Sequence, residues 1–370
     1  MQFIDLQAQY RKIKPQVQAR INTVLEHGKY ILGPECDELE QRLAAYTGRK
    51  HCISCANGTD ALLMALMALD TGPGDAVFTT TFTFIATAEV IALTGATPVF
   101  VDIDEQTYNI DPKKLHEAVM RVEKDGRLAL KAIIPVDLFG LCAPYDNIAE
   151  IASEFGLNVI EDAAQSFGAA CNNEKACCFG DIACTSFFPA KPLGCYGDGG
   201  AIFTDDNDRA ETLRSIRVHG KGSDKYDNIR IGINGRLDTL QAAILLAKLD
   251  IFDEELAAKN KVAQHYSETL KDVVKVPVIP DGSSSAWAQY SVMSDKRDAV
   301  CAALKVKGIP TAIYYPKPLH LQTAFKDLGY SEGDFEAAER VSKEIFSLPM
   351  HAYLRDEEIQ RICEIIAEIA

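Results

Sequence analysis

The chain has 370 residues, 47% of them hydrophobic, which is long enough for a large core and for two domains rather than one. Lysine and arginine number 38 and aspartate and glutamate 53, so the formal net charge is −15 and the overall field repels nucleic acid and acidic membranes. The longest apolar run, residues 61–69, is too short to cross a bilayer and residues 1–16 lack the apolar core of a signal peptide, so we expect a soluble, cytoplasmic protein.

Two helices are predicted at the start of the chain, over residues 6–26 and 35–46, with a break at Gly33-Pro34 between them. Short apolar strands and helices then alternate. The expected strands cover residues 51–56, 76–81, 96–103, 130–138, 157–163, 182–188 and 200–204, and the expected helices cover 60–69, 85–93, a segment opened by Asp111 and Pro112, and 145–154. This alternation is typical of an α/β fold whose mostly parallel sheet is covered by helices on both faces.

The character of the sequence changes near residue 250, where helices rich in lysine and glutamate surround a serine-rich turn at 281–286. Further along, the pattern predicts strands over 288–294 and 310–315, a helix over 297–307 between them, and a C-terminal helix with isoleucines at helical spacing. We therefore predict a large domain of residues 1–249 and a small α+β domain of residues 250–370.

The eleven cysteines predict no disulfide framework, because the count is odd and the chain is expected to be intracellular. Cys52 and Cys55 form a CxxC pair, but residues three apart on a strand point to opposite faces, so they are poorly placed to share a disulfide or a metal. Most of these thiols are expected to act as small buried apolar groups.

A carboxylate stands at the end of a predicted buried strand, in the segment LNVIEDA. Ligands of open α/β sheets bind beyond the carboxyl ends of the strands, and a buried carboxylate needs a partner. Asp162 therefore either caps a helix or pairs with an arginine, or it faces a protonated nitrogen of a bound ring.

The segment ANGTDALLMAL opens a helix directly after the first expected strand. Free amides and the positive end of the helix dipole at Thr59 and Asp60 suit a phosphate, although a helix start of this kind also occurs without any ligand.

One lysine, Lys191, lies between two prolines in the glycine-punctuated stretch SFFPAKPLGCYGDGGA. Apolar surroundings lower the pKa of a lysine and free its amine as a nucleophile that forms a Schiff base with an aldehyde. A solvated loop lysine is the alternative. Pro192 favours an extended backbone at Lys191, and the glycines that follow permit tight turns.

Together these three features match the needs of pyridoxal 5′-phosphate (PLP). The helix start and nearby hydroxyls would hold the phosphate, Asp162 would keep the pyridine nitrogen protonated, and Lys191 would hold the aldehyde and then shuttle a proton. An aromatic ring for stacking is available in TFTFIAT.

These motifs resemble those of the DegT/StrS family of nucleotide-sugar aminotransferases, and the likeness runs nearly end to end. It also includes GKYILGPE, FVDID, IRVHG, GINGRLDTLQAA, YYPKPLH and SLPMH. The resemblance implies an aspartate-aminotransferase-type fold, PLP as cofactor, L-glutamate as amino donor and a homodimer with shared active sites.

The resemblance also implies roles for individual residues. Lys191 is then the Schiff-base lysine, Asp162 pairs with the pyridine nitrogen and Gln165 touches the ring hydroxyl. Phe84 stacks on the ring. The phosphate contacts implied are Thr59 and Asp60 through backbone amides, Ser186 through its hydroxyl, and Asn234 from the other subunit. The implied sugar-nucleotide contacts are Arg236, Tyr315, His320 and Arg217.

A local excess of basic residues favours an acidic substrate. Between residues 212 and 236 the six bases Arg214, Arg217, Lys221, Lys225, Arg230 and Arg236 outnumber the two acids Asp224 and Asp227, a local charge of 6 − 2 = +4. A diphosphate or a uronic carboxylate could be steered there, although a solvated loop would look the same.

Within the family, the sequence SFFPAKPLGCYGDGGA around Lys191, together with IRVHG and GRLDTLQ, resembles the sequences of one branch. That branch aminates the 3-keto group of UDP-2-acetamido-2-deoxy-3-oxo-glucuronate for lipopolysaccharide O-antigen. A 4-keto sugar, a dTDP sugar and either stereochemistry of the new amine stay open.

Three other classes of protein are weighed against an aminotransferase. A sugar dehydratase of the same fold carries histidine in place of the lysine, whereas this chain has Lys191. A non-catalytic sensor would not need the complete cofactor set. A dinucleotide-binding oxidoreductase is disfavoured, because GCYGDGG lacks the G-x-G-x-x-G spacing and does not open a helix after the first strand.

Overall fold

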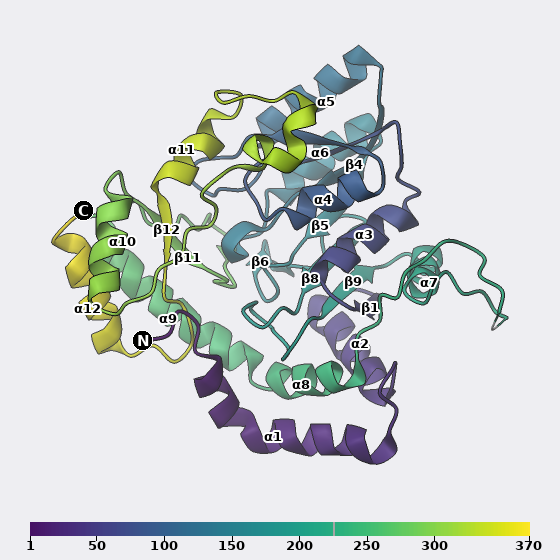
Figure 1. The fold of residues 1–370 in the computed structure, drawn as a ribbon, viewed down its shortest axis with the longest axis horizontal. Coiled ribbons are helices and arrows are strands. Elements are labelled where there is room, and N and C mark those ends of the chain that lie inside the picture. Colours follow the sequence, from purple (N-terminus) through teal and green to yellow (C-terminus); the bar gives the residue numbers. More distant parts are fainter. Residues whose placement is uncertain (225) are drawn as a thin grey trace.

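A seven-stranded sheet forms the centre of the larger part of the molecule in the computed structural model, which describes residues 1–224 and 226–370 (Figure 1). Its strands are β1 (His51–Cys55), β2 (Asp75–Thr80), β3 (Thr97–Val101), β4 (Ala129–Ile134), β5 (Asn158–Asp162), β8 (Ile182–Ser186) and β9 (Gly200–Thr204). Across the sheet they are ordered β1-β9-β8-β5-β4-β2-β3, and β9 runs antiparallel to both of its neighbours while the others are mutually parallel. The predicted α/β class with a mostly parallel sheet is confirmed.

Helices cover both faces of this sheet, because apolar side chains alternate between the faces along each strand. One face carries α3 (Gly58–Ala68), α4 (Ala86–Leu93) and α7 (Asn207–Ile216), and the other carries α2 (Pro34–Thr47), α5 (Pro112–Asp125), α6 (Tyr145–Phe155) and α8 (Thr239–Leu249). Strand β1 illustrates the alternation: Cys55 packs with α3, whereas Cys52 packs with α2 and α8. The predicted opposite orientation of these two cysteines is confirmed, and all eleven cysteines are free thiols.

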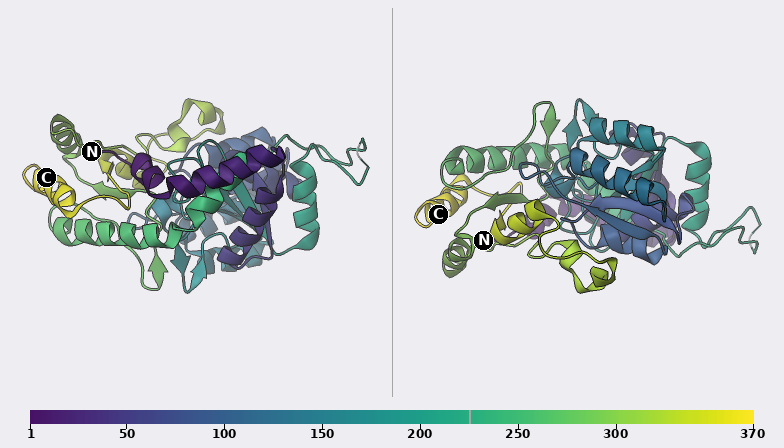
Figure 2. Two further views of the ribbon diagram at one scale, coloured as in Figure 1. Left: turned by 90° about the horizontal axis from the view of Figure 1, so that it is seen from below. Right: turned by 90° about the horizontal axis from the view of Figure 1, so that it is seen from above.

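Helix α1 (Leu6–His27) lies along the outside of this body (Figure 2). The side chain of Asp5 caps its start by accepting a hydrogen bond of 2.8 Å from the Ala8 amide. Ile13 and Val17 bury one stripe of the helix against Ile244 of α8.

The C-terminal part has a core of its own around the two-stranded antiparallel pair β11 (Tyr290–Met293) and β12 (Ile345–Leu348). Three helices pack on this pair: α9 (Phe252–Leu270), α10 (Arg297–Val306) and α12 (Asp356–Ala367). The isoleucines predicted to bury one face of the last helix do so, since Ile359, Ile362 and Ile366 are each at most 1% exposed.

The prediction of a strand over residues 310–315 is wrong. This segment makes a single isolated bridge, between Ala312 and Ser347, and the neighbour that pairs with β11 is β12. Strand β12 was not predicted from the sequence, because it is only four residues long and follows α11 (Glu336–Glu344) without a break. The helical pattern of α11 therefore runs into it.

Several contacts join the C-terminal part to the large sheet body. The short strand β10 (Ser283–Ser284) pairs with β6 (Ala170–Cys171), which also pairs with β7 (Glu174–Lys175). Short 3₁₀ turns lie at η1 (Leu138–Gly140), η2 (Leu319–Leu321) and η3 (Thr323–Leu328). Near the N-terminus, the Phe3 carbonyl accepts from the Met350 amide at 3.1 Å. The domain boundary at residue 250 stays a prediction.

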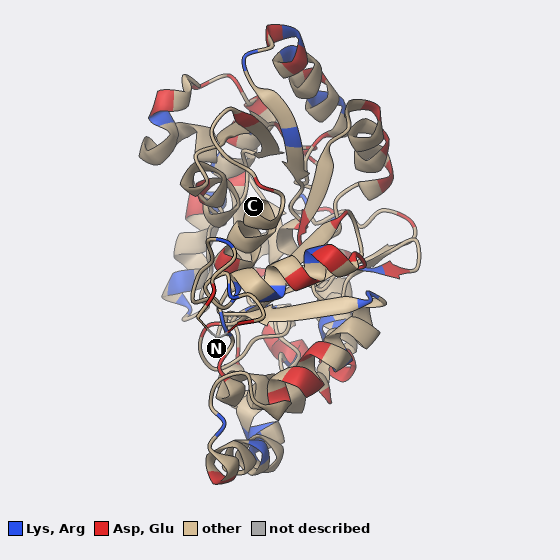
Figure 3. Cartoon of the chain, turned by 90° about the vertical axis from the view of Figure 1, so that its right-hand side faces the viewer, with Lys and Arg blue, Asp and Glu red and all other residues tan. Residues whose placement is uncertain are grey.

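Among the described residues, no helix combines the length and the apolar composition that a membrane span requires. The acidic residues that give the chain its negative charge are spread over many helices instead of gathering in one place (Figure 3).

Candidate active site

Three chemically important segments meet at the carboxyl edge of the sheet. Strand β1 runs into Asn57 and the start of α3, β5 ends at Asp162, and β8 ends at Ser186. The parallel register pairs Asp162 with Cys184, which sets the ends of β5 and β8 side by side. Parallel strands thus deliver all three segments to one edge, where ligands of such sheets bind.

Asp162 is a buried carboxylate, 4% exposed, without an ion-pair partner among the described residues. Its Oδ2 accepts from the Thr87 hydroxyl at 2.8 Å, and its Oδ1 accepts from the Ala164 amide at 3.2 Å. Burial raises the pKa of Asp162, while these two hydrogen bonds and the charge of Lys191 lower it. Such a carboxylate is stabilised by a cationic group placed against its free lone pairs.

The segment between β8 and β9 holds Lys191 in a closed loop. The Phe187 amide donates to the Gly199 carbonyl at 2.7 Å, and the Lys191 amide donates to the Phe188 carbonyl at 2.8 Å. A side chain at Gly194 would place its Cβ 2.5 Å from the Pro189 carbonyl oxygen, so only glycine fits there. These contacts fix where the lysine side chain leaves the backbone.

Burial lowers the pKa of Lys191 to about 8, and the nearby carboxylate of Asp162 opposes this shift. The Nζ of Lys191 has no hydrogen-bond partner within residues 1–224 and 226–370. An amine that is partly neutral and free of partners near neutral pH can act as a nucleophile and can take and return a proton.

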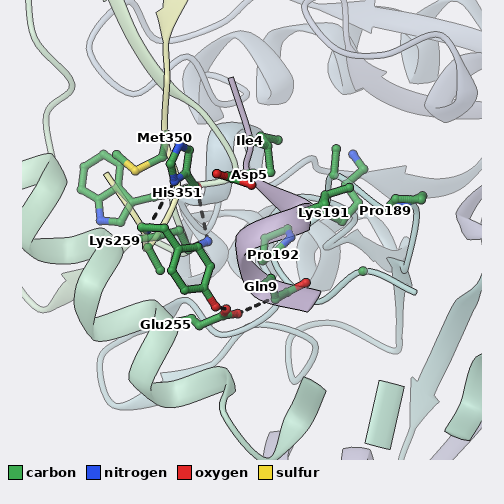
Figure 4. A pocket seen from close by; sticks show the side chains of 17 residues that line it. Ile4, Asp5, Gln9, Pro189, Lys191, Pro192, Glu255, Lys259, Met350 and His351 are labelled. Carbon is green, nitrogen blue, oxygen red and sulfur yellow. Dashed lines mark hydrogen bonds between the residues drawn. The ribbon is translucent and has the colours of Figure 1, made fainter. Parts of the chain in front are cut away.

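The back of the lysine loop borders a cavity, formed where the N-terminal segment meets the C-terminal part. Figure 4 shows Lys191 and Pro192 on one side of it and Glu255, Lys259 and His351 on the other. Glu255 accepts from Gln9 at 2.7 Å. Helix α9 and the segment that follows β12 therefore face the back of the lysine loop across this cavity.

A cradle for an anion lies at the start of α3. The Asp60 amide donates to the Asn57 side chain at 2.7 Å, so it would have to leave this cap to bind a phosphate, whereas the amides of Gly58 and Thr59 have no partner among the described residues. A side chain at Gly58 would place its Cβ 2.7 Å from the Cβ of Ser186. Glycine thus lets the Ser186 hydroxyl lie beside the free amides.

Aromatic and amide groups form the opposite wall. Phe84 is 54% exposed, which is unusual for phenylalanine, and its ring centre lies 6.5 Å from that of Tyr315. The Gln165 side chain donates to the Tyr315 hydroxyl at 3.3 Å and accepts from the Phe139 amide at 2.9 Å. An exposed phenyl face beside hydroxyl and amide groups suits a flat polar ring.

Arg217, predicted to bind substrate, contacts other residues of the protein through one of its nitrogens. It is 8% exposed, and its Nη1 donates to Glu40 at 2.6 Å and to the Ser54 carbonyl at 2.9 Å. Glu40, whose side chain is 14% exposed, is thus paired with a cation, whereas the Nε of Arg217 is buried without a hydrogen-bond partner among the described residues, so a substrate role for Arg217 stays a prediction.

His320 is likewise engaged inside the protein. Its Nδ1 lies 2.8 Å from the Thr81 hydroxyl and its Nε2 3.1 Å from Glu339, and its side chain is fully buried. A direct contact with a sugar nucleotide would require the ring to leave these partners, so that role stays a prediction.

The remaining predicted contacts lie between α7 and α8, where the chain projects away from the sheet (Figure 1). Asn234 is exposed and bridges to Val218, and the Nε of Arg236 is buried without a hydrogen-bond partner among the described residues. Of the basic cluster, Arg214 pairs with Glu211 at 2.8 Å, and Lys225 lies outside the described residues. Because Arg214 and Arg217 both pair with glutamates outside residues 212–236, the unpaired positive charge of this segment is smaller than the sequence count indicates.

The residues present fit PLP. Within the described part of the chain, a buried carboxylate lacks an ion-pair partner, an amine lacks a hydrogen-bond partner, and a glycine leaves room beside a serine hydroxyl and two free amides. Thr87, the partner of Asp162, was missed from the sequence. Its only signal is its place in the first turn of a helix, three residues after Phe84.

Comparisons with known proteins give one consistent result. Residues 11–367 match the model of the DegT/DnrJ/EryC1/StrS aminotransferase family. The chain is 52% identical to UDP-2-acetamido-2-deoxy-3-oxo-D-glucuronate aminotransferase of Pseudomonas aeruginosa, over 98% of both chains. It is 46% identical to a pleiotropic regulatory protein of Geobacillus stearothermophilus, over 99% of this chain and 97% of that protein.

Comparison with solved structures points to the same family. A DegT DnrJ EryC1 StrS aminotransferase from Brucella abortus has a TM-score of 0.97 at 55% identity, covering 100% of this chain and 99% of that one. NtdA from Bacillus subtilis, with bound cofactor PMP, has a TM-score of 0.89 at 28% identity, covering 99% of this chain and 82% of that one.

Proposed function

The chain belongs to the DegT/DnrJ/EryC1/StrS aminotransferase family and is a PLP-dependent sugar aminotransferase of the aspartate-aminotransferase type, and from this premise we propose its substrate. The substrate is UDP-2-acetamido-2-deoxy-3-oxo-glucuronate, which receives an amino group at carbon 3 from L-glutamate. The product, UDP-2-acetamido-3-amino-2,3-dideoxy-glucuronate, is used for surface polysaccharide such as O-antigen. The 52% identity to the Pseudomonas enzyme of that name supports this choice over other 3- or 4-keto sugars.

The observation that carries the chemistry is the placement of the Lys191 amine near the buried carboxylate of Asp162 at the carboxyl edge of the sheet. PLP, when bound, accepts electrons from the carbon that loses its proton. Asp162 holds the protonated ring nitrogen, which keeps the ring electron-poor. The Lys191 amine, with its pKa lowered to about 8, takes the proton from the α-carbon of glutamate. It would then deliver the proton to the aldehyde carbon of the cofactor, the carbon that receives the amino group.

The other residues orient and bind. The amides of Gly58 and Thr59 and the hydroxyl of Ser186 hold the phosphate at the start of α3. Phe84 covers one face of the ring. Gln165 donates a hydrogen bond to the ring hydroxyl.

We place the active site at the interface of a cytoplasmic homodimer. The projecting segment between α7 and α8 carries Asn234 toward the phosphate of the partner subunit and Arg236 toward the acidic substrate. The exposed Asn234 and the unpartnered Nε of Arg236 support these roles. A guanidinium suits a uronic carboxylate or a diphosphate, because it binds either in a bidentate way.

A regulatory role without catalysis is the second candidate, and the name of the Geobacillus relative motivates it. A regulator of this kind would bind PLP or the sugar nucleotide and change no bond. Turnover separates the two functions.

The test is an assay of the cofactor-loaded protein with L-glutamate and UDP-2-acetamido-2-deoxy-3-oxo-glucuronate, with products identified by mass and NMR. The expected products are 2-oxoglutarate and the 3-amino sugar in equal amounts, with at least a hundredfold lower kcat/KM for dTDP-linked 4-keto sugars. A preference for a 4-keto or a dTDP sugar would refute the substrate assignment. Steady-state turnover by the Lys191→Ala variant would refute the role of the lysine.

A further inference from the structure

Asp162 is held by a hydroxyl that the family roles above do not include. Thr87, in the first turn of α4, is 1% exposed and donates to Oδ2 of Asp162 at 2.8 Å. The weaker contact at Oδ1, 3.2 Å from the Ala164 amide, leaves that oxygen better able to accept a further hydrogen bond. The two carboxylate oxygens are thus unequal before any ligand binds.

We propose that Thr87 is a positioning residue of the transamination, whose hydroxyl occupies one oxygen of Asp162 and so fixes which oxygen meets the pyridine nitrogen of the cofactor. This inference rests on the proposed role of Asp162.

The direction of the hydrogen bonds follows from the chemistry of the groups. An ionised carboxylate only accepts, so the single hydroxyl proton of Thr87 points to Asp162. The Thr83 hydroxyl, 3.4 Å from that of Thr87, then acts as the donor to Thr87. Such a chain polarises each bond in turn and strengthens the one that ends on the charge.

The same short segment also carries the ring-stacking residue. Phe84 lies between Thr83 and Thr87, and the Thr87 amide donates to the Phe84 carbonyl at 3.4 Å. One turn of backbone therefore links the face of the ring to the carboxylate at its nitrogen. A shift of Thr87 would move both supports of the cofactor together.

Loss of the hydroxyl has a defined consequence. Burial raises the pKa of Asp162, and the hydrogen bond from Thr87 lowers it. Without that bond the carboxylate is more basic, loses its fixed orientation and competes more strongly for the proton of the ring nitrogen. The cofactor then binds more weakly and its nitrogen is less fully protonated.

The experiment compares wild type with Thr87→Val, which keeps the shape of the side chain, and Thr87→Ser, which keeps the hydroxyl. Each protein is loaded with ¹⁵N-labelled cofactor, and the nitrogen chemical shift and the cofactor Kd are measured. We expect Thr87→Val to weaken binding about tenfold and to move the shift toward the neutral ring, and Thr87→Ser to restore both within about twofold. Should Thr87→Val not fold, Thr87→Cys, with its weak thiol donor, is expected to move both readouts in the same direction.

Thr79→Val is the matched control. Its hydroxyl is also fully buried and donates to the Ile134 carbonyl at 2.8 Å within the sheet, so this variant loses a comparable hydrogen bond away from Asp162. It is expected to lower stability and to leave the nitrogen shift unchanged. A shift in Thr79→Val equal to that in Thr87→Val would overturn the proposal.

Asp162→Asn distinguishes a failure of the positioning role of Thr87 from a failure of the role of Asp162 itself. If Asp162→Asn changes the nitrogen shift and Thr87→Val or Thr87→Cys does not, the positioning role of Thr87 is wrong and that of Asp162 stands. If Asp162→Asn leaves the shift unchanged, the role of Asp162 fails, and the inference about Thr87 fails with it.

Discussion

Two lysines on opposite sides of one cavity have the same lowered pKa and different surroundings. Burial brings the pKa of both Lys191 and Lys259 to about 8. Lys259, on α9, donates to the Ala286 carbonyl at 2.5 Å and to the Trp287 carbonyl at 3.4 Å. The amine of Lys191 has no such partner among the described residues and lies near the carboxylate of Asp162.

This difference teaches that a shifted pKa does not by itself mark a catalytic lysine. The amine of Lys259 joins α9 to the segment before β11 and is committed to that contact. Lys191 is held only through its backbone, so its amine is free to react. Structural and catalytic lysines are therefore separated by where the hydrogen bonds of the amine go.

The largest effect on activity is expected when each of the two lysines is replaced separately. Lys191→Ala should lower transamination about a thousandfold or more, because it removes both the nucleophile and the proton carrier. Lys259→Met should keep kcat within about threefold and lower the free energy of unfolding by about 1–3 kcal/mol, because two buried carbonyls lose their donor. Steady-state kinetics and denaturant unfolding measure both. A thousandfold loss of kcat in Lys259→Met would contradict the assignment of Lys259 as a structural and not a catalytic lysine.

A second comparison sets Arg217, which forms an ion pair with Glu40, against Arg236, which forms no ion pair with any of the described residues. Arg217→Met should destabilise the protein by about 1–3 kcal/mol, because it leaves the partly buried Glu40 without its cation, and should leave the KM for the sugar nucleotide within about twofold. Arg236→Ala should raise that KM about tenfold or more with little loss of stability. Thermal unfolding and substrate titration check the pair. A raised KM with unchanged stability in Arg217→Met would restore its predicted substrate role.

The pH dependence of stability tests the burial of Lys259. Its pKa in the folded protein, about 8, lies below the ordinary value of 10.5, so between these pH values the unfolded chain binds more protons. The free energy of unfolding of wild type should therefore rise relative to that of Lys259→Met from pH 8 to 10.5, by at most about 3 kcal/mol. Below pH 8 the two curves should run parallel. Curves that stay parallel up to pH 10.5 would contradict the lowered pKa.

The smallest effect is expected at the ring face. Phe84→Leu keeps an apolar side chain and loses the aromatic face, so cofactor affinity should fall about threefold to tenfold. Equilibrium dialysis of the cofactor measures it. As a control on the surface, Leu93→Ala changes an apolar side chain at the far end of α4 that is 68% exposed and should leave the affinity unchanged. An equal loss in both variants would mean that stacking on Phe84 is not the cause.

Where Asp162 and Ser186 lie in the fold could be predicted from the sequence, because their positions follow from strand order. Asp162 and Ser186 end parallel strands, and a glycine-rich loop follows the second of them, so their meeting at one edge could be inferred. The family, the fold class and the PLP cofactor were also predicted correctly from the ordered motifs.

Pairings between distant parts of the chain could not be predicted. Glu40 and Arg217 stand 177 positions apart, and nothing in either local sequence marks the buried ion pair. Thr87 and Asp162 are 75 positions apart and meet only because α4 packs over the end of the sheet. Such contacts depend on tertiary packing, which overrides local pattern and local charge.

The most direct test of the account is the absorbance spectrum of the cofactor-loaded protein before and after addition of L-glutamate. The account predicts that the visible band of the cofactor held by Lys191 disappears and that the near-ultraviolet band of the aminated cofactor rises, in wild type and in Lys259→Met alike. A visible band that ignores glutamate would mean another amino donor or a binding role. The absence of any visible band in the loaded wild type would contradict the assignment of Lys191.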